Sequence, residues 1–170
     1  VTQQSLGDVI GMVLQEPFLF SNTVLENIRY NTEASTEDVI QSCKVIGAHK
    51  FIMALPDGYE TLLEERGSNL SIGQRQLISF ARALVANPKI LVLDEATANI
   101  DSYTELVIQN ALGKLLKNRT ALVIAHRLST IRNSDHIVVV NNGSIKEQGT
   151  HDELLAHQGL YSNLWSMNYA

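Results

Sequence analysis

The chain has 170 residues, of which 45% are apolar and 18% charged, a balance typical of a folded globular domain and unlike that of a disordered segment. Its formal net charge is −5 and its lysines and arginines are scattered, which argues against a nucleic-acid-binding surface. The single cysteine excludes an internal disulfide, and no apolar run approaches the ~18–20 residues of a membrane-spanning helix.

The N-terminal part of the chain predicts one strand followed by a long helical region. Residues 9–14 form an apolar run typical of a β-strand, and Gln15 follows it, just before a proline that stops regular pairing. The neutral amide of Gln15, at the end of a strand, is suited to ligate Mg²⁺ or to orient a water molecule. From about residue 23 to 84 the pattern is mainly helical and is interrupted by turns.

A long helix is predicted from the segment Leu70-Ser71-Ile72-Gly73-Gln74 to about Ala86. Ser71 and Gln74 have the spacing of a capping box, in which two side chains satisfy each other's backbone N–H groups. A helix N-terminus with a serine hydroxyl, an adjacent glycine and free N–H groups is also an anion-binding site. The two interpretations are compatible, because a capping side chain is able to turn towards a phosphate.

The strongest local signal is the run Ile90-Leu91-Val92-Leu93-Asp94-Glu95. Its apolar part predicts a buried parallel strand, and the carboxyl end of such a strand is where open α/β sheets bind their ligands. Asp94 is suited to hold Mg²⁺, which prefers one or two carboxylates together with phosphate oxygens. Glu95 is placed to accept a proton from an attacking water molecule. The alternative is that the two acids cap the turn that follows.

Beyond Glu95 the chain alternates helices with strands. Ser102 is expected to cap a helix, with Glu105 in capping-box spacing, and residues 121–124 predict the next buried strand. His126 follows that strand, and it is either a hydrogen-bonded surface residue or a group that contacts a terminal phosphate. The alternation predicts an α/β layer with a largely parallel sheet.

The C-terminal segment predicts a hairpin and a helix. Residues 136–140 and 144–148 have the pattern of two strands, with Asn142-Gly143 as the turn between them. A last helix is expected from Thr150, with Glu153 completing a second capping box.

A phosphate-binding loop of the G-x-x-x-x-G-K-[ST] type occurs nowhere in the 170 residues. The nearest string, Gly113-Lys114-Leu115, lies inside the predicted amphipathic helix and has no hydroxyl after the lysine. The sequence therefore predicts no phosphate-binding loop of this type within the chain.

The order of these motifs resembles the nucleotide-binding, ATP-hydrolysing domain of ABC transporters, particularly exporters whose membrane and ATPase parts are fused. The resemblance runs from about Ser5 to Leu164. It implies a P-loop NTPase-like (RecA-like) α/β fold, a parallel sheet with an inserted helical subdomain, without its N-terminal strands and P-loop. We expect a Q-loop strand region at 1–17, a helical subdomain with the signature at 18–88, and the C-terminal part of the RecA-like fold at 89–170.

The resemblance implies that four residues act on Mg²⁺ and ATP. Gln15 matches the family's Q-loop, and Asp94 and Glu95 match the Walker B aspartate and the catalytic glutamate. His126 matches the switch histidine. Gln15 and Asp94 are then expected to serve Mg²⁺, Glu95 to polarise the attacking water, and His126 to contact the γ-phosphate.

In the same family two ATPase domains pair head to tail, and each ATP lies between the P-loop of one domain and the signature of the other. Residues 70–74 resemble the signature, and Asp101 matches the D-loop aspartate. The resemblance therefore implies that Ser71, Gly73, Gln74 and Asp101 contact the partner's nucleotide. It also implies a second partner, the transmembrane domain of the exporter, and a location at the cytoplasmic face of a membrane.

The chain departs from the family pattern at several points, from which we draw expectations about activity and association. Ile72 replaces the usual signature glycine, and Leu77 stands where these exporters commonly carry a basic residue. Without a P-loop the isolated 170 residues are expected to have negligible ATPase activity. The missing strand and its helix are expected to lie against the Asp94 strand, and their loss to leave an apolar edge and face that favours self-association.

Two other functional classes compete with the motor domain of an exporter. The first is a non-catalytic, truncated ABC chain that serves as a binding module through its signature helix. The second is a chromosome-maintenance or repair ATPase. Relatives of that second class bring long heptad repeats and basic patches that face DNA, and neither is visible here.

Overall fold

The computed structural model describes residues 2–7, 9–95, 102–125 and 128–169. They fall into two compact units, of which the first spans Val1–Ile124 and the second Ala125–Ala170. Within the described ranges, no helix is both long enough and apolar enough to cross a membrane.

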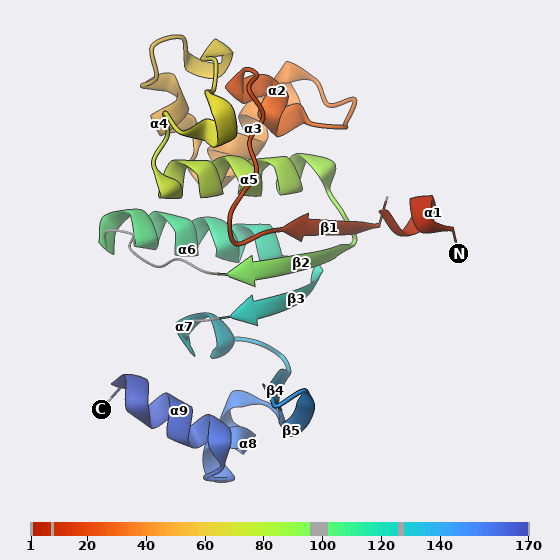
Figure 1. Cartoon of the computed structure of the whole chain (residues 1–170), viewed down its shortest axis with the longest axis vertical. Coiled ribbons are helices and arrows are strands. Elements are labelled where there is room, and N and C mark those ends of the chain that lie inside the picture. Colours follow the sequence, from red (N-terminus) through yellow and green to blue (C-terminus); the bar gives the residue numbers. More distant parts are fainter. Residues whose placement is uncertain (1, 8, 96–101, 126–127, 170) are drawn as a thin grey trace. The chain divides into compact units, whose positions relative to one another are not determined.

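The first unit consists of a three-stranded sheet and the helices that pack with it (Figure 1). In chain order its elements are α1 (Gln3–Gly7), β1 (Ile10–Val13), α2 (Val24–Arg29), α3 (Thr36–Ile46), α4 (His49–Met53), the 3₁₀ turns η1 (Gly58–Glu60) and η2 (Glu65–Gly67), α5 (Ile72–Ala86), β2 (Ile90–Glu95), α6 (Ser102–Leu116) and β3 (Thr120–Ala125). The predicted first strand, the helical region and the helix that ends at Ala86 are confirmed.

The three strands run parallel in the order β1-β2-β3, with Val13 opposite Leu93 in the register (Figure 1). Leu91 and Leu93 are buried, so the helices cover the face of the sheet to which they point. β2 lies between β1 and β3, and both of its edges are paired. The expectation that a further strand lies against the Asp94 strand is therefore wrong, because an added strand would pair with an outer edge of β1 or β3.

α5 is the central helix of the first unit. Ser71 caps its N-terminus, and Asn87 ends it in a left-handed conformation with a φ of 46°. Apolar residues recur at helical spacing along it, and Leu77, Ile78 and Ala81 are buried. The helix contacts α2, α3, α6 and β1. Packing on several sides therefore holds it in place, which matters because a helix of this length is marginal on its own.

Arg82, near the C-terminal end of α5, ties this helix to the segment that follows β1. Its guanidinium donates to the backbone carbonyls of Asn27 at 2.8 Å and Phe18 at 2.9 Å, and it lies 5.0 Å from the ring centroid of Tyr30. The side chain of Asn27 is 1% exposed and bonds both the N–H and the carbonyl of Phe20. Burial lowers the pKa of Arg82, and the two carbonyl oxygens replace the lost water.

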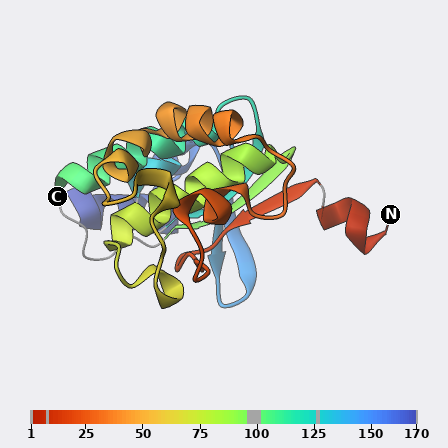
Figure 2. The same ribbon diagram turned by 90° about the horizontal axis from the view of Figure 1, so that it is seen from above.

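The second unit contains a hairpin and three helices within its described residues. Its elements are α7 (Leu128–Ile131), β4 (Ile137–Asn141), β5 (Ser144–Gly149), α8 (His151–Ala156) and α9 (Leu160–Tyr169). β4 and β5 pair antiparallel, and Figure 2 shows them joined by a tight turn. Asn142 and Gly143 in that turn have φ values of 50° and 71°, as the favoured two-residue turn requires, so the predicted hairpin is confirmed.

The two capping boxes predicted after Glu95 have different outcomes. Thr150 and Glu153 form theirs at the start of α8, which confirms the prediction. Ser102, by contrast, is the first residue of α6 and not the residue before it. The position that would cap α6 is residue 101, which lies outside the described residues.

The expectation of a single last helix is wrong, because α8 ends at Ala156 and α9 begins at Leu160. Gln158 between them has a φ of 53°, which interrupts helical geometry. The carboxylate of Glu147 on β5 then accepts hydrogen bonds from the N–H groups of Leu160 and Tyr161. The first N–H groups of an α-helix have no acceptor within the helix as a rule, so Glu147 gives α9 its own N-terminal cap.

Candidate functional site

The carboxyl ends of β1 and β2 bring three predicted site residues to one edge of the sheet. Because Val13 and Leu93 are register partners, Gln15 follows β1 at the edge where Asp94 and Glu95 end β2. Gln15 is exposed and Asp94 is half-buried. The backbone of Glu95 belongs to β2, and its side chain lies outside what the structure describes. The structure thus places these residues where open α/β sheets bind ligands, and their chemical roles stay predictions.

Two predicted site residues, Asp101 and His126, lie outside the described residues. In the sequence, position 126 directly follows Ala125, the last residue of β3. Both assignments therefore stay predictions.

The groups at this edge fit a magnesium ion. Carboxylate oxygens of Asp94 and the amide oxygen of Gln15 are hard ligands of the kind Mg²⁺ prefers. No group of three His, Cys, Asp or Glu side chains in the described part of the chain is placed to hold a metal ion. Magnesium sites commonly take only one or two carboxylates from the protein and are completed by phosphate oxygens and water, so a magnesium site at this edge stays a prediction.

Cysteine chemistry is not available at neutral pH. Cys43 on α3 is fully buried, and burial raises the pKa of its thiol to about 11, although a hydrogen bond with Tyr59 opposes the shift. A thiol must ionise to act as a nucleophile. Cys43 is therefore a small core residue, as the sequence indicates.

The N-terminus of α5 carries the capping box predicted for it. Ser71 Oγ accepts a hydrogen bond from the N–H of Gln74 at 3.2 Å, and Gln74 Oε1 accepts one from the N–H of Ser71 at 2.9 Å. Ser71 is exposed, and so is Ile72, at 44%. The capping interpretation is confirmed, whereas contact with a phosphate stays a prediction.

Gly73 has a packing role that the sequence does not indicate. It is buried, and a Cβ atom at this position would lie 2.2 Å from Cγ2 of Thr104 on α6. Only glycine allows the two helices to approach this closely. No sequence signal identifies the contact, because it depends on which residue of another helix faces α5.

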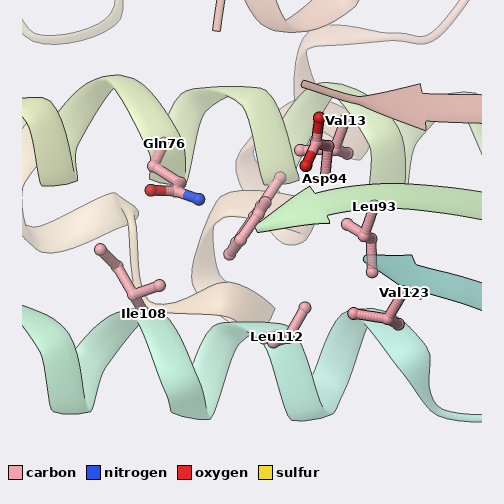
Figure 3. Close-up of a pocket in the computed structure, with 8 residues that line it drawn as sticks. Val13, Gln76, Leu93, Asp94, Ile108, Leu112 and Val123 are labelled. Carbon is pink, nitrogen blue, oxygen red and sulfur yellow. The ribbon is translucent and has the colours of Figure 1, made fainter. Parts of the chain in front are cut away.

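Sequence reasoning also missed Gln76, which lies on the same helix. Its side chain is 2% exposed, and Oε1 has no hydrogen-bond partner among the described residues. Gln76 belongs to the wall of a cavity of about 10 Å³ that residues of α5, α6 and the sheet line, and its amide nitrogen lies on the side of the other lining residues (Figure 3). Besides Gln76 and Asp94, the wall consists of apolar residues: Val13, Phe80, Leu93, Ile108, Leu112 and Val123.

Comparison with known proteins identifies one family. The model of the ABC transporter family matches residues 1–98. The chain is 55% identical over 167 residues to an ABC transporter ATP-binding protein, YknV, of Bacillus subtilis, which covers 98% of this chain and 28% of that protein. It is 48% identical over 162 residues to a fatty acid ABC transporter ATP-binding/permease protein of Mycobacterium bovis, with 95% and 26% coverage.

A solved structure agrees with these relatives. The chain resembles a bacterial Atm1-family ABC exporter with ATP bound, with a TM-score of 0.90 and 43% sequence identity. The match covers 100% of this chain and 30% of the exporter chain. It confirms the predicted P-loop NTPase-like fold. The chain spans less than a third of the length of these matched proteins.

Proposed function

This chain belongs to the ABC transporter family, and from that premise we propose that it is part of the ATP-binding and hydrolysing motor domain of an exporter. The observation that carries the proposal is the placement of Gln15, Asp94 and Glu95 at the carboxyl edge of a parallel sheet. In this family, ATP hydrolysis at such an edge drives the movement of a substrate across a membrane.

We assign each candidate residue its own role in ATP hydrolysis. Asp94 and Gln15 would hold Mg²⁺, which supplies positive charge to the phosphate oxygens when it is bound. The Glu95 carboxylate accepts a proton from the water that attacks the γ-phosphate. His126 contacts that phosphate and stabilises the charge that develops on it.

We assign the N-terminus of α5 to the ATP site of a partner domain. Ser71, Gly73 and Gln74 at this end, together with Asp101, contact the nucleotide of a second ABC ATPase domain that is paired head to tail. The observation in favour is the formed capping box, which leaves a helix N-terminus at the surface with a hydroxyl beside it. Such an end attracts phosphate through its N–H groups and its dipole.

We place the helical subdomain at 18–88, between the Q-loop region at 1–17 and the C-terminal part of the RecA-like fold at 89–170. Its exposed aromatic residues Phe18 and Phe20 lie next to the Q-loop and are held by Asn27 and Arg82. They would face the transmembrane domain of the exporter at the cytoplasmic side of the membrane.

The 170 residues alone would not hydrolyse ATP, because they contain no P-loop to hold the β- and γ-phosphates. A second candidate function follows from the same fact. A chain with a formed signature helix and no P-loop acts as a binding module that completes the ATP site of another domain. The cap of α5 is compatible with this alternative and with the motor domain alike.

ATP hydrolysis by the full-length protein that carries this chain tests the proposal. We expect Glu95→Gln to reduce kcat by about 10²-fold or more, because general base catalysis contributes on that order. It should also stabilise an ATP-bound dimer of ATPase domains, visible in sedimentation. Glu33→Gln, at an exposed position outside the site, serves as the control and should leave both unchanged.

Two results would contradict the proposal. The first is hydrolysis by the full-length protein that does not respond to Glu95→Gln. The second is steady-state hydrolysis by the isolated 170 residues that Glu95→Gln abolishes, which would show that no P-loop is needed.

A further inference from the structure

The peptide group between Leu70 and Ser71 is held from both sides by side chains of α5. Its carbonyl oxygen, on Leu70, accepts a hydrogen bond from Nη1 of Arg75 at 2.6 Å. Its N–H, on Ser71, donates to Oε1 of Gln74 at 2.9 Å. A peptide group is planar and rigid, and the Cα atom of Ser71 is one of its atoms. The two bonds together therefore fix the point from which the Ser71 side chain extends.

Arg75 also attaches the segment that precedes this peptide group. Nη1 donates to the carbonyl oxygen of Gly67 at 3.5 Å, and the same oxygen accepts the N–H of Leu70 at 2.9 Å. Gly67 is buried with a φ of 67°, and a Cβ atom there would lie 3.3 Å from Cδ of Arg75. The aliphatic part of Arg75 therefore packs on the same backbone that its guanidinium bonds.

The two bonds on the peptide group differ in what happens to them when a nucleotide is contacted. Ser71 and Gln74 are both assigned to the ATP of a partner domain, and in this structure each bonds the other's backbone N–H. A side chain that turns to a phosphate gives up its cap, so the N–H of Ser71 would lose Gln74. Arg75 has no assigned contact with the nucleotide, and a hydrogen bond from a charged donor is among the stronger ones.

We propose that Arg75 is a positioning residue for Ser71. It holds the peptide group between Leu70 and Ser71 in place while the capping box opens, so that the serine hydroxyl meets the phosphate in one orientation. This role rests on the proposed placement of the N-terminus of α5 in the ATP site of a partner domain. A group that is already ordered loses less entropy on contact, so Arg75 contributes to the reaction without touching the nucleotide.

The test uses the full-length protein and the variant Arg75→Met, which keeps most of the aliphatic side chain and removes the donors. We expect kcat/KM for ATP to fall about 10-fold, the effect of losing one hydrogen bond from a charged group. Arg75→Lys should restore most of the loss, because both hydrogen bonds come from one nitrogen and an ammonium group can replace it.

Arg119→Met is the matched control, because it removes a similar arginine at the other end of α5. Nη1 of Arg119 donates to the carbonyl of Leu115 at 2.6 Å, and Nη2 donates to the side chain of Asn87, which ends α5. We expect this variant to change kcat/KM by less than about 2-fold. An equal loss in both methionine variants would show a general effect on stability and would overturn the proposal.

A double-mutant cycle shows whether Arg75 acts through Ser71. If it does, the double variant Ser71→Ala with Arg75→Met should have a kcat/KM within about 2-fold of that of Ser71→Ala alone. Independent losses would multiply, and that result overturns the proposal. If Ser71→Ala lowers kcat/KM and Arg75→Met does not, only the role of Arg75 fails. If Ser71→Ala has no effect, the proposed role of the N-terminus of α5 fails.

A crystal structure of the full-length Glu95→Gln variant with ATP bound tests the proposal without changing Arg75. Nη1 within hydrogen-bond distance of the Leu70 carbonyl, with Gln74 turned from the N–H of Ser71 to the nucleotide, supports it. An Arg75 side chain turned away from Leu70, or a capping box that stays closed beside bound ATP, overturns it.

Discussion

Gly73 lies in the first turn of α5, where the family resemblance points to contact with a phosphate. The structure adds a reason for glycine that involves no ligand, because the backbone of α5 approaches Thr104 on α6 at this position. The lack of a larger side chain at Gly73 is therefore needed for the packing of α5 against α6. A larger residue here would displace the N-terminus of α5, and Ser71 with it.

We expect Gly73→Ala to lower the free energy of unfolding by about 1–3 kcal/mol, the usual cost of adding a methyl group to a packed interface. Thr104→Ser removes the clashing methyl and keeps the hydroxyl, so it should restore most of the loss in the double variant. Gly113→Ala is the control, because a Cβ there meets nothing within 4 Å. In urea denaturation it should gain about 0.5–1 kcal/mol from reduced chain entropy. Equal gains for both alanine variants would contradict the packing argument.

For single residues, the sequence predicts those roles that depend on neighbours within a few positions along the chain. The pairing of Ser71 with Gln74 depends on a spacing within one helical turn, and it is confirmed. Gly73 and Gln76 depend on what packs against α5, and no local pattern carries that information. For the same reason the cavity beside Asp94 could not be foreseen.

Among the elements, α9 depends on a residue from another part of the second unit. The backbone N–H groups of Tyr161 and Leu160 hold the pKa of Glu147 below its ordinary value, and the charge of His157 acts in the same direction. The ionised form of Glu147 is thus favoured by folding. Its contribution to stability is present above pH 4.5, the ordinary pKa, and is lost as the pH falls through the lowered pKa.

We expect the second unit to loosen in acid and Glu147→Gln to flatten that dependence below about pH 4.5. Trp165 on α9 is the only tryptophan of the chain, so its fluorescence reports this unit. Gly159→Ala should act like Glu147→Gln, because a Cβ there would lie 2.1 Å from Glu147 Oε1. Some slope should persist in both variants, since hydrogen bonds from Thr150 also lower the pKa of Glu153. Identical profiles for wild type and Glu147→Gln would refute the assignment.

Individual helices and strands can be predicted from the sequence more reliably than the order in which the strands pair. The run from Ile90 to Leu93 predicts a buried strand, and Asn142-Gly143 predicts a hairpin turn, because both signals are local. The position of β2 between β1 and β3 depends on pairing between strands that long helices separate. The division of the last helix was missed because Glu147, which caps α9, lies on β5.

At the scale of the whole molecule, one face of the sheet in the first unit is apolar and open to solvent. Met12 is 63% exposed, Leu122 62% and Ile124 51%. On β3, alternation places the last two opposite Val123, which lines the cavity on the covered face. Apolar residues gathered on a strand surface favour association.

We expect the isolated 170 residues to self-associate at micromolar concentration, and Leu122→Lys to shift the weight-average mass measured by light scattering towards the monomer. Leu62→Lys is the control, because Leu62 is 68% exposed away from the sheet. A monodisperse wild-type monomer under these conditions would contradict this prediction.

The anchoring of Arg82 has a mechanical consequence for α5. The guanidinium clamps this helix to Phe18, while Ser71 lies eleven residues away, or about 16 Å along a stiff rod. A tilt of about 5° at the clamped end would therefore displace the serine by roughly 1.4 Å, half the length of a hydrogen bond. A force applied at Phe18 would therefore move Ser71 at the other end of α5, even if the helix itself does not bend.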